Sequence, residues 1–491
     1  MNQRRQRSRL APRFRSAPIL TALLIGLSAA FGSARTGSTP AGPDDPAAER
    51  STASDSSATG ALYVATSGDD SNPGTSEKPW RTIGHAAAIA GPGDIVHVSP
   101  GVYRENVLIT RSGTAEQPVR FVSDQKWGAQ IIGVTYDPTV RISAGHIVFA
   151  NFAVSNPGGP SGIEVTGAGG SASYDRVIGN EVYDVAGPCK LGRCAPGHYS
   201  GGGGIILSNT TDNLDHDDDA IGNVIHDIGD PRNPQNADLV HGIYIELGGD
   251  VDYPRQGRYS ARVENNVIFR VEGDGITSWH CATHAVIVNN TVVDAGVHGI
   301  LLSASEECGA NAVHRLPNRQ SVVANNIVYH CGWHAQCSLS AVAHLRCLRP
   351  SFGGGCGIVV SNAEDATVSH NLLGDNLCRS DAGAGLAILT TADSHNTVAD
   401  NLTDADPGFV KYNPDGSGDF HLRSGSPAVA AGAAKYGVTR DIDGRTRPEH
   451  RAPSIGAYEY PIASLPRAAS ARSTASKRRA TVPIAASAAN G

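Results

Sequence analysis

The sequence predicts an all-β protein built as a solenoid, a coil in which short strands stack in parallel from one turn to the next. The first observation is glycine, which supplies 57 of the 491 residues and costs about 1 kcal/mol relative to alanine inside a helix. The second is an internal repeat of strand-like motifs. The formal net charge of −7 also argues against a protein that binds nucleic acid, since that function needs a basic surface.

Two short motifs alternate along the middle of the chain. One is an asparagine followed by aliphatic residues, as at Asn266 and Asn290, which lie one turn of 24 residues apart. The other is a glycine that leads an aliphatic strand, as at Gly242 and Gly275. Such a unit buries its apolar residues only against its neighbours, which is typical of a solenoid. We expect the asparagines to stack as an internal hydrogen-bonding ladder at one corner of the coil.

Segments at both ends of this region resemble a known family. Tyr63-Val-Ala-Thr-Ser-Gly-Asp-Asp-Ser-Asn-Pro-Gly-Thr and Asp441-Ile-Asp-Gly through Gly456-Ala-Tyr-Glu are similar to the first and closing segments of right-handed parallel β-helix proteins of the pectate-lyase-like superfamily. The resemblance covers roughly residues 62–460. It implies a single right-handed parallel β-helix, with residues 80–90 as a short helix that caps its N-terminal end. It says little about the reaction, because fold does not imply function.

The segments outside the coil predict export. Residues 1–34 carry six Arg within the first fifteen positions, then an apolar run and small residues, which is the anatomy of a secretory signal peptide. The run is shorter than the ~20 residues of a membrane span, so no span is expected after cleavage. Residues 35–60 and 462–491 have the composition of a disordered linker and tail, which leaves 61–461 as the β-helix domain. We expect a secreted monomer, extracellular or periplasmic.

Strand parity places a candidate catalytic patch on the outer face of the coil. If Ile243 and Ile245 point inward, the residues that follow each of them point outward. On three consecutive turns the residue before the strand glycine is a histidine, an aspartate and a histidine, and stacking makes them one row. A carboxylate between two imidazoles suits proton transfer or metal binding; the alternative is that they only cap the turns. The predicted catalytic residues are His241, Tyr244, Asp274 and His298, and the predicted substrate contacts are Glu246, Trp279 and His280, with the tryptophan offering a flat face to a sugar ring.

A second candidate site is acidic. Asp215, Asp217, Asp218 and Asp219 lie close together in one short stretch. Their oxygens suit Ca²⁺, which takes six to eight oxygen ligands. The alternative is a solvated turn between strands.

The resemblance implies an acidic polysaccharide as partner and lyase-type β-elimination of a polyuronate as the reaction. That reaction needs charge neutralisation at the substrate carboxylate, often by Ca²⁺, and a base for the C5 proton. Related pectate lyases use Lys or Arg as the base, but no Lys lies between 191 and 410. A histidine base with Tyr244 as proton donor is the expected substitute. A glycoside hydrolase, which needs paired carboxylates, a C5-epimerase and a non-catalytic glycan-binding surface protein remain open.

Nine cysteines in an exported chain predict disulfides. Cys189 and Cys194 would close a small loop. Four more lie in the insertion between Asn326 and Gly357, and we expect disulfides to close that insertion: Cys331, Cys337, Cys347 and Cys356. The stretch from His330 to Cys337 also has the ligand types that suit zinc, but a disulfide loop is the preferred interpretation, and the ninth thiol is unassigned.

Overall fold

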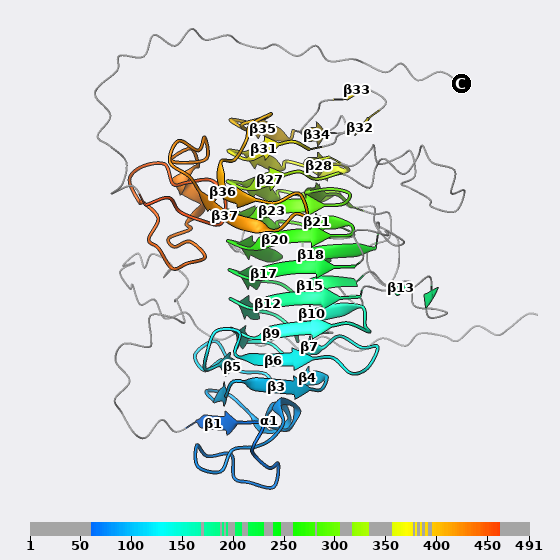
Figure 1. The fold of residues 1–491 in the computed structure, drawn as a ribbon, viewed down its shortest axis with the longest axis vertical. Helices are drawn as coiled ribbons and strands as arrows, with labels where there is room; N and C mark the ends of the chain where they lie inside the picture. Colours follow the sequence, from blue (N-terminus) through cyan, green and yellow to red (C-terminus); the bar gives the residue numbers. More distant parts are fainter. Residues whose placement is uncertain are drawn as a thin grey trace, which may run out of the picture. The chain divides into compact units, whose positions relative to one another are not determined.

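Three parallel sheets share the turns of one coil. The computed structural model describes residues 60–167, 171–186, 202–208, 215–229, 239–246, 259–279, 282–304, 317–332, 356–376 and 395–461, with a few short strands between 189 and 390. The predicted signal peptide, nearly all of the linker and the tail lie outside them. Strands of each sheet pair in parallel with the strand one turn later, and each turn visits the sheets in the same order (Figure 1). The chain folds as a right-handed parallel β-helix, as predicted.

The three sheets are named A, B and C in the order in which a turn visits them. Sheet A contains β1 (Ala61–Val64), β2 (Ile95–Val98), β5 (Val119–Ser123), β8 (Ile147–Ala150), β11 (Arg176–Ile178), β16 (Asp218–Ile221), β19 (Ala261–Glu264), β22 (Val286–Val288), β26 (Val322–Ala324), β30 (Thr367–Ser369) and β35 (Thr397–Ala399). Sheet B contains β3 (Gly101–Arg104), β6 (Ala129–Ile132), β9 (Ala153–Asn156), β12 (Glu181–Val185), β17 (Val224–Ile228), β20 (Val267–Val271), β23 (Thr291–Ala295), β27 (Ile327–Tyr329) and β31 (Leu372–Gly374). Sheet C contains β4 (Val107–Ile109), β7 (Val140–Ile142), β10 (Ser161–Val165), β15 (Gly202–Ser208), β18 (Val240–Glu246), β21 (Asp274–Ser278), β24 (Ile300–Leu302), β28 (Ile358–Val360) and β34 (Ile388–Thr390).

In the described parts of the chain, four two-stranded pairs accompany these sheets. They are β13 (Cys189–Lys190) with β14 (Arg193–Cys194), β25 (Asn318–Arg319) with β29 (Ala363–Glu364), β32 (Arg379–Ser380) with β33 (Gly383–Ala384), and β36 (Phe409–Tyr412) with β37 (Gly418–Leu422).

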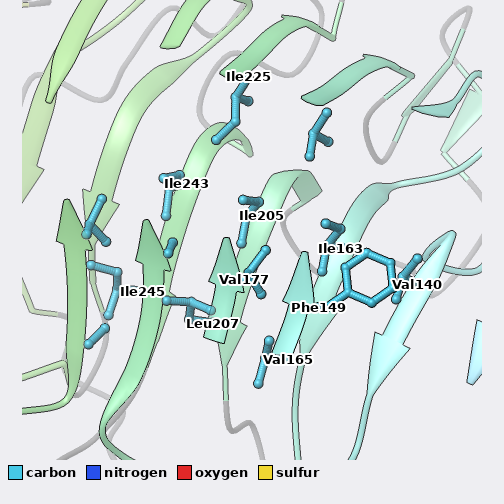
Figure 2. Close-up of a cluster of buried hydrophobic side chains, with 14 of the residues drawn as sticks. Val140, Phe149, Ile163, Val165, Val177, Ile205, Leu207, Ile225, Ile243 and Ile245 are labelled. Atoms are coloured by element: carbon cyan, nitrogen blue, oxygen red, sulfur yellow. The ribbon is translucent and has the colours of Figure 1, made fainter. Parts of the chain in front are cut away.

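Alternate residues of the strands fill the interior of the coil. Ile243 and Ile245 of β18 are fully buried there, beside Ile205 and Leu207 of the preceding turn (Figure 2). The inward parity expected for β18 is therefore confirmed. Stacked aliphatic side chains of this kind contribute about 1.5–3 kcal/mol each through burial.

The predicted asparagine ladder runs along the corner between sheets A and B. The amide of Asn266 donates to Asn290 Oδ1 at 3.0 Å, and the amide of Asn290 donates to Asn326 Oδ1 at 2.9 Å. The residue before each of these asparagines turns the corner in the left-handed region, as at Asn265 with φ 55°. Each ladder amide also donates to a backbone carbonyl, as Asn290 does to Val263 at 2.9 Å. The ladder thus satisfies polar groups that the corner would otherwise bury unpaired.

Glycine leads the strands of sheet C because the corner between sheets B and C has no room for a side chain. A Cβ on Gly242 would lie 2.5 Å from the carbonyl oxygen of Gly275 and 2.6 Å from Ile268 Cγ2. A Cβ on Gly275 would lie 2.3 Å from Val292 Cγ1. The residues that precede these glycines consequently face outward.

Elements near both ends of the described chain cover parts of the coil. The helix α1 (Ile83–Ile89) lies within the predicted segment 80–90, is capped by Thr82, and adds Ile83, Ala86 and Ala87 to the core. At the other end of the chain, β36 and β37 pack across sheet B (Figure 1). A short 3₁₀ helix, Ala434–Tyr436, follows them.

The closing segment is anchored by a buried arginine. Arg447 is only 1% exposed, pairs with Glu459 at 3.1 Å, and donates to Asn265 Oδ1 of the coil at 2.9 Å. An arginine that makes several charge-assisted hydrogen bonds can be buried without an unpaired charge.

Candidate functional site

The glycine corner brings two rings together on the outer face of sheet C. His241 and Tyr244 are three residues apart, a spacing that puts side chains on opposite faces of a regular strand. The turn at Gly242 removes this alternation. As a result the two rings stack, with centroids 4.6 Å apart and an interplanar angle of 14°.

The predicted row of titratable residues is present. His241 on β18 pairs with Asp274 on β21 in the sheet register. The backbone N–H of His298, on the following turn, donates to Asp274 Oδ1 at 3.0 Å. Asp274 therefore lies between the two histidines, as stacking of the glycine motifs predicts.

Thr277 also joins this row, although it was not among the predicted site residues. Its hydroxyl donates to Asp274 Oδ2 at 2.9 Å and contacts His241 Nδ1 at 3.0 Å, while Nδ1 lies 3.7 Å from the carboxylate oxygen itself. A hydroxyl has one proton, and an ionised carboxylate only accepts. Thr277 must then accept from His241, so the neutral form of His241 carries its proton on Nδ1 and has a lone pair on Nε2.

In His298 the roles of the two ring nitrogens are reversed. Its Nδ1 accepts a hydrogen bond from the backbone N–H of Cys356 at 3.2 Å. When neutral it therefore carries its proton on Nε2. One imidazole of the row is thus arranged as a base and the other as a donor.

Burial and neighbouring charges set the protonation of the site. Burial alone would raise the pKa of Asp274, but His298, His241 and the Thr277 hydroxyl outweigh it and hold that pKa below its usual range. Burial lowers the pKa of His298 and raises that of Tyr244 well above 10.0. At neutral pH the site contains an ionised Asp274, a neutral His298 and a protonated phenol.

The site is enclosed. His241, Tyr244, Asp274 and His298 are between 2% and 8% exposed. Chain segments 247–258, 280–281 and 305–316, which follow the strands here, lie outside the described residues.

The three predicted substrate contacts differ in their surroundings. Glu246 lies on the same face and accepts from the Ser208 hydroxyl at 2.7 Å. Trp279 is half-buried and packs against a cluster that contains Leu301 and Val359, so part of its ring is covered by protein. His280 lies outside the described residues, and its role stays a prediction.

Two of the four acidic residues are fully buried and bind backbone. Asp215 accepts from the N–H groups of Gly167 at 3.0 Å and Ala172 at 3.2 Å. Asp218 accepts from the N–H of Asp175 at 2.9 Å, and burial raises its pKa well above the usual value. Both carboxylates therefore tie adjacent turns together.

The other two have side-chain partners. Asp217 pairs with His216 Nδ1 at 2.7 Å, and Asp219 accepts from the hydroxyl of Tyr259 at 2.8 Å. Burial raises the pKa of Asp219 to about 6 although Arg176 and the Tyr259 hydroxyl oppose it. Within the described ranges no three His, Cys, Asp or Glu side chains are grouped to hold a metal ion. Calcium binding at Asp215, Asp217, Asp218 and Asp219 stays a prediction.

The predicted disulfides fall only in part within the described residues. Cys189 and Cys194 are direct cross-strand partners in the backbone of the β13–β14 hairpin, and the disulfide between them stays a prediction. Cys356 is disulfide-bonded. Cys331 is a free, buried thiol whose pKa burial raises, so the expectation that the whole insertion is stapled is wrong for this residue.

Comparison with known proteins adds short or distant similarities. Residues 66–108 match a family described as a protein of unknown function, DUF1565. An uncharacterized Bacillus subtilis protein, YwoF, is 30% identical over 134 residues, which is 25% of this chain and 29% of that protein. The matched stretch thus spans under a third of the relative.

Solved structures with similar folds share little sequence. An alginate lyase from Paenibacillus has 15% identity and a TM-score of 0.44 over 65% of this chain and 92% of its own. The pectate lyase Pel9A has 12% identity and a TM-score of 0.42 over 82% and 97%. No helix of the described segments has the length and apolar character to cross a membrane.

Proposed function

We propose that this protein acts on an acidic polysaccharide and cleaves it by β-elimination. The observation that carries the proposal is the hydrogen-bonded series Asp274–Thr277–His241, which leaves a lone pair on His241 Nε2. A base held in one tautomer by an ionised carboxylate is what proton abstraction requires. The buried carboxylate stabilises the imidazolium that forms when His241 takes a proton.

The elimination assigns one task to each side chain. His241 Nε2 takes the C5 proton of a uronate, the C5–H electrons form the C4–C5 double bond, and the bond from C4 to the glycosidic oxygen breaks. Tyr244, whose raised pKa keeps the phenol protonated, donates its proton to the departing oxygen. His298 donates from Nε2 to the substrate carboxylate and offsets the charge that develops there.

The experiment is incubation of the purified protein with pectate, alginate and other polyuronates, with and without Ca²⁺. Ultraviolet absorbance of unsaturated ends and new reducing ends are followed together. Unsaturated ends that form at the same rate as reducing ends support elimination, whereas reducing ends alone indicate a hydrolase. Neither signal, with binding retained, indicates a glycan-binding protein. A calcium requirement would point to the acidic residues or to the substrate carboxylates.

Two variants test the site. His241→Gln and Asp274→Asn are expected to lower kcat by at least about 100-fold, in line with loss of a general base. His226→Gln is the matched control, because His226 is also a histidine that lies beside a carboxylate, Asp227 at 2.7 Å, but it is on sheet B. Full activity in both site variants would show that the assigned site is wrong.

A further inference from the structure

A straight row of outward side chains runs from the candidate site toward the N-terminal end of the coil. The sheet register places Tyr244 beside Ile206, Ile206 beside Glu164, Glu164 beside Arg141, and Arg141 beside Leu108. Neighbouring strands lie about 4.8 Å apart. Arg141 is therefore three turns, or about 14 Å, from the ring of Tyr244 along the coil axis.

Exposure rises along this row. Ile206 and Tyr244 are 5% and 8% exposed, whereas the side chains of Glu164 and Arg141 are 22% and 39% exposed and Leu108 is 53% exposed. The row thus leads from the enclosed site to open surface. A chain-like substrate bound at the site can extend along it.

Arg141 is incompletely paired. Its Nη2 lies 3.6 Å from Glu164 Oε2, which is too long for a good bidentate ion pair, and its Nε is buried without a hydrogen-bond partner. The ionised form of Glu164 is disfavoured, because burial raises its pKa more than Arg141 lowers it. The nearby carboxylates of Asp137 and Glu246 also raise this pKa. The carboxylate beside the guanidinium is thus one whose ionised form is disfavoured.

We propose that Arg141 binds a carboxylate of the polysaccharide three turns from the site of cleavage, in competition with Glu164. This inference rests on the proposed function, since it takes the polymer at His241 to be a polyuronate. Guanidinium groups recognise carboxylates through paired charge-assisted hydrogen bonds. A neutral glycan has no group that matches Arg141 in this way.

The test compares KM and kcat for oligouronates of increasing length. Arg141→Gln is expected to raise KM about tenfold or more for long oligomers, with kcat unchanged, because a remote contact supplies uniform binding. Oligomers too short to extend three turns from the site should show no change. Glu164→Gln should lower KM for the long oligomers, since it removes the competing carboxylate.

Arg104→Gln is the matched control, because Arg104 is exposed on sheet B and its loss changes the net charge equally. If the native protein cleaves polyuronates and Arg141→Gln shows the native length dependence, the subsite is refuted while the proposed function stands. If the native protein cleaves none, equilibrium binding of polygalacturonate is measured instead. Binding that depends on Arg141 and not on Arg104 supports the subsite without the lyase activity. Binding that is independent of Arg141 overturns the subsite.

Discussion

Replacing Thr277 by valine removes the hydroxyl that connects the buried carboxylate to the imidazole. Asp274 Oδ2 loses a bond of 2.9 Å, and the proton on His241 Nδ1 loses an acceptor at 3.0 Å. A hydrogen bond to a charged group contributes about 1.5–3 kcal/mol. We therefore expect Thr277→Val to destabilise the fold by about that amount and to lower kcat at least tenfold.

The pH dependence separates a role in the reaction from a role in folding. The folded-state pKa of Asp274 is depressed, so its contribution to stability is present above the unfolded value near 4 and is lost as pH falls through the folded value. Removing the hydroxyl takes away one group that lowers this pKa. In Thr277→Val the contribution of Asp274 to stability is therefore smaller, and its loss on acidification is complete at a higher pH.

Urea denaturation between pH 3 and 8 measures this shift, and initial rates of unsaturated-end formation measure kcat. Thr277→Ser retains a hydroxyl and should restore both. Thr291→Val is the control, because the Thr291 hydroxyl is buried in sheet B, away from the site, and accepts a hydrogen bond from the N–H of Ala457 at 3.0 Å. This variant should lower stability without changing kcat in folded protein. A folded Thr277→Val protein with native kcat and a native pH profile would refute the hydrogen-bonded series.

Three other changes test the fold and the processing of the chain. Asp218→Asn removes a buried carboxylate whose raised pKa makes ionisation unfavourable. The stability of the native protein should therefore fall as pH rises above the unfolded pKa, and in urea denaturation at pH 8 the variant should be more stable by about 1 kcal/mol or more. A variant that is less stable at pH 8 contradicts this. Gly275→Ala should prevent folding, because its Cβ would clash with the core, whereas Gly158→Ala, with open space around it, should change the melting temperature little. N-terminal sequencing of exported protein should show removal of residues 1–34, and an intact N-terminus on exported protein would contradict the signal peptide.

The repeat allowed the sequence to predict which residues become neighbours. Equivalent positions in successive glycine motifs lie one turn apart, so His241, Asp274 and His298 were expected to meet, and they do. Thr277 was missed because parity alone gives it only an outward direction. One signal was present: Thr277 follows Asp274 by three residues, the same spacing that joins Tyr244 to His241 across the glycine corner.

Other features depend on contacts that the repeat does not encode. The acidic stretch suggested one shared ion site, but residues adjacent at a corner diverge: Asp218 points to the backbone of the preceding turn, whereas Asp217 adopts φ 57° and pairs with His216. The closing segment was recognised by resemblance, yet its packing across sheet B relies on Arg447 reaching Asn265, 182 residues away. No local pattern reports a contact at that separation.

The charge of Asp274 is itself an argument that the row does more than support the coil. On the two turns before His241 the same row contains Ser161 and Gly203, so the corner is built there without any charged side chain. Burying a carboxylate costs several kcal/mol unless partners offset it, and Asp274 is offset by two histidines and Thr277. An arrangement that needs four cooperating groups, where serine or glycine suffices elsewhere in the same row, is expected where a proton must be moved.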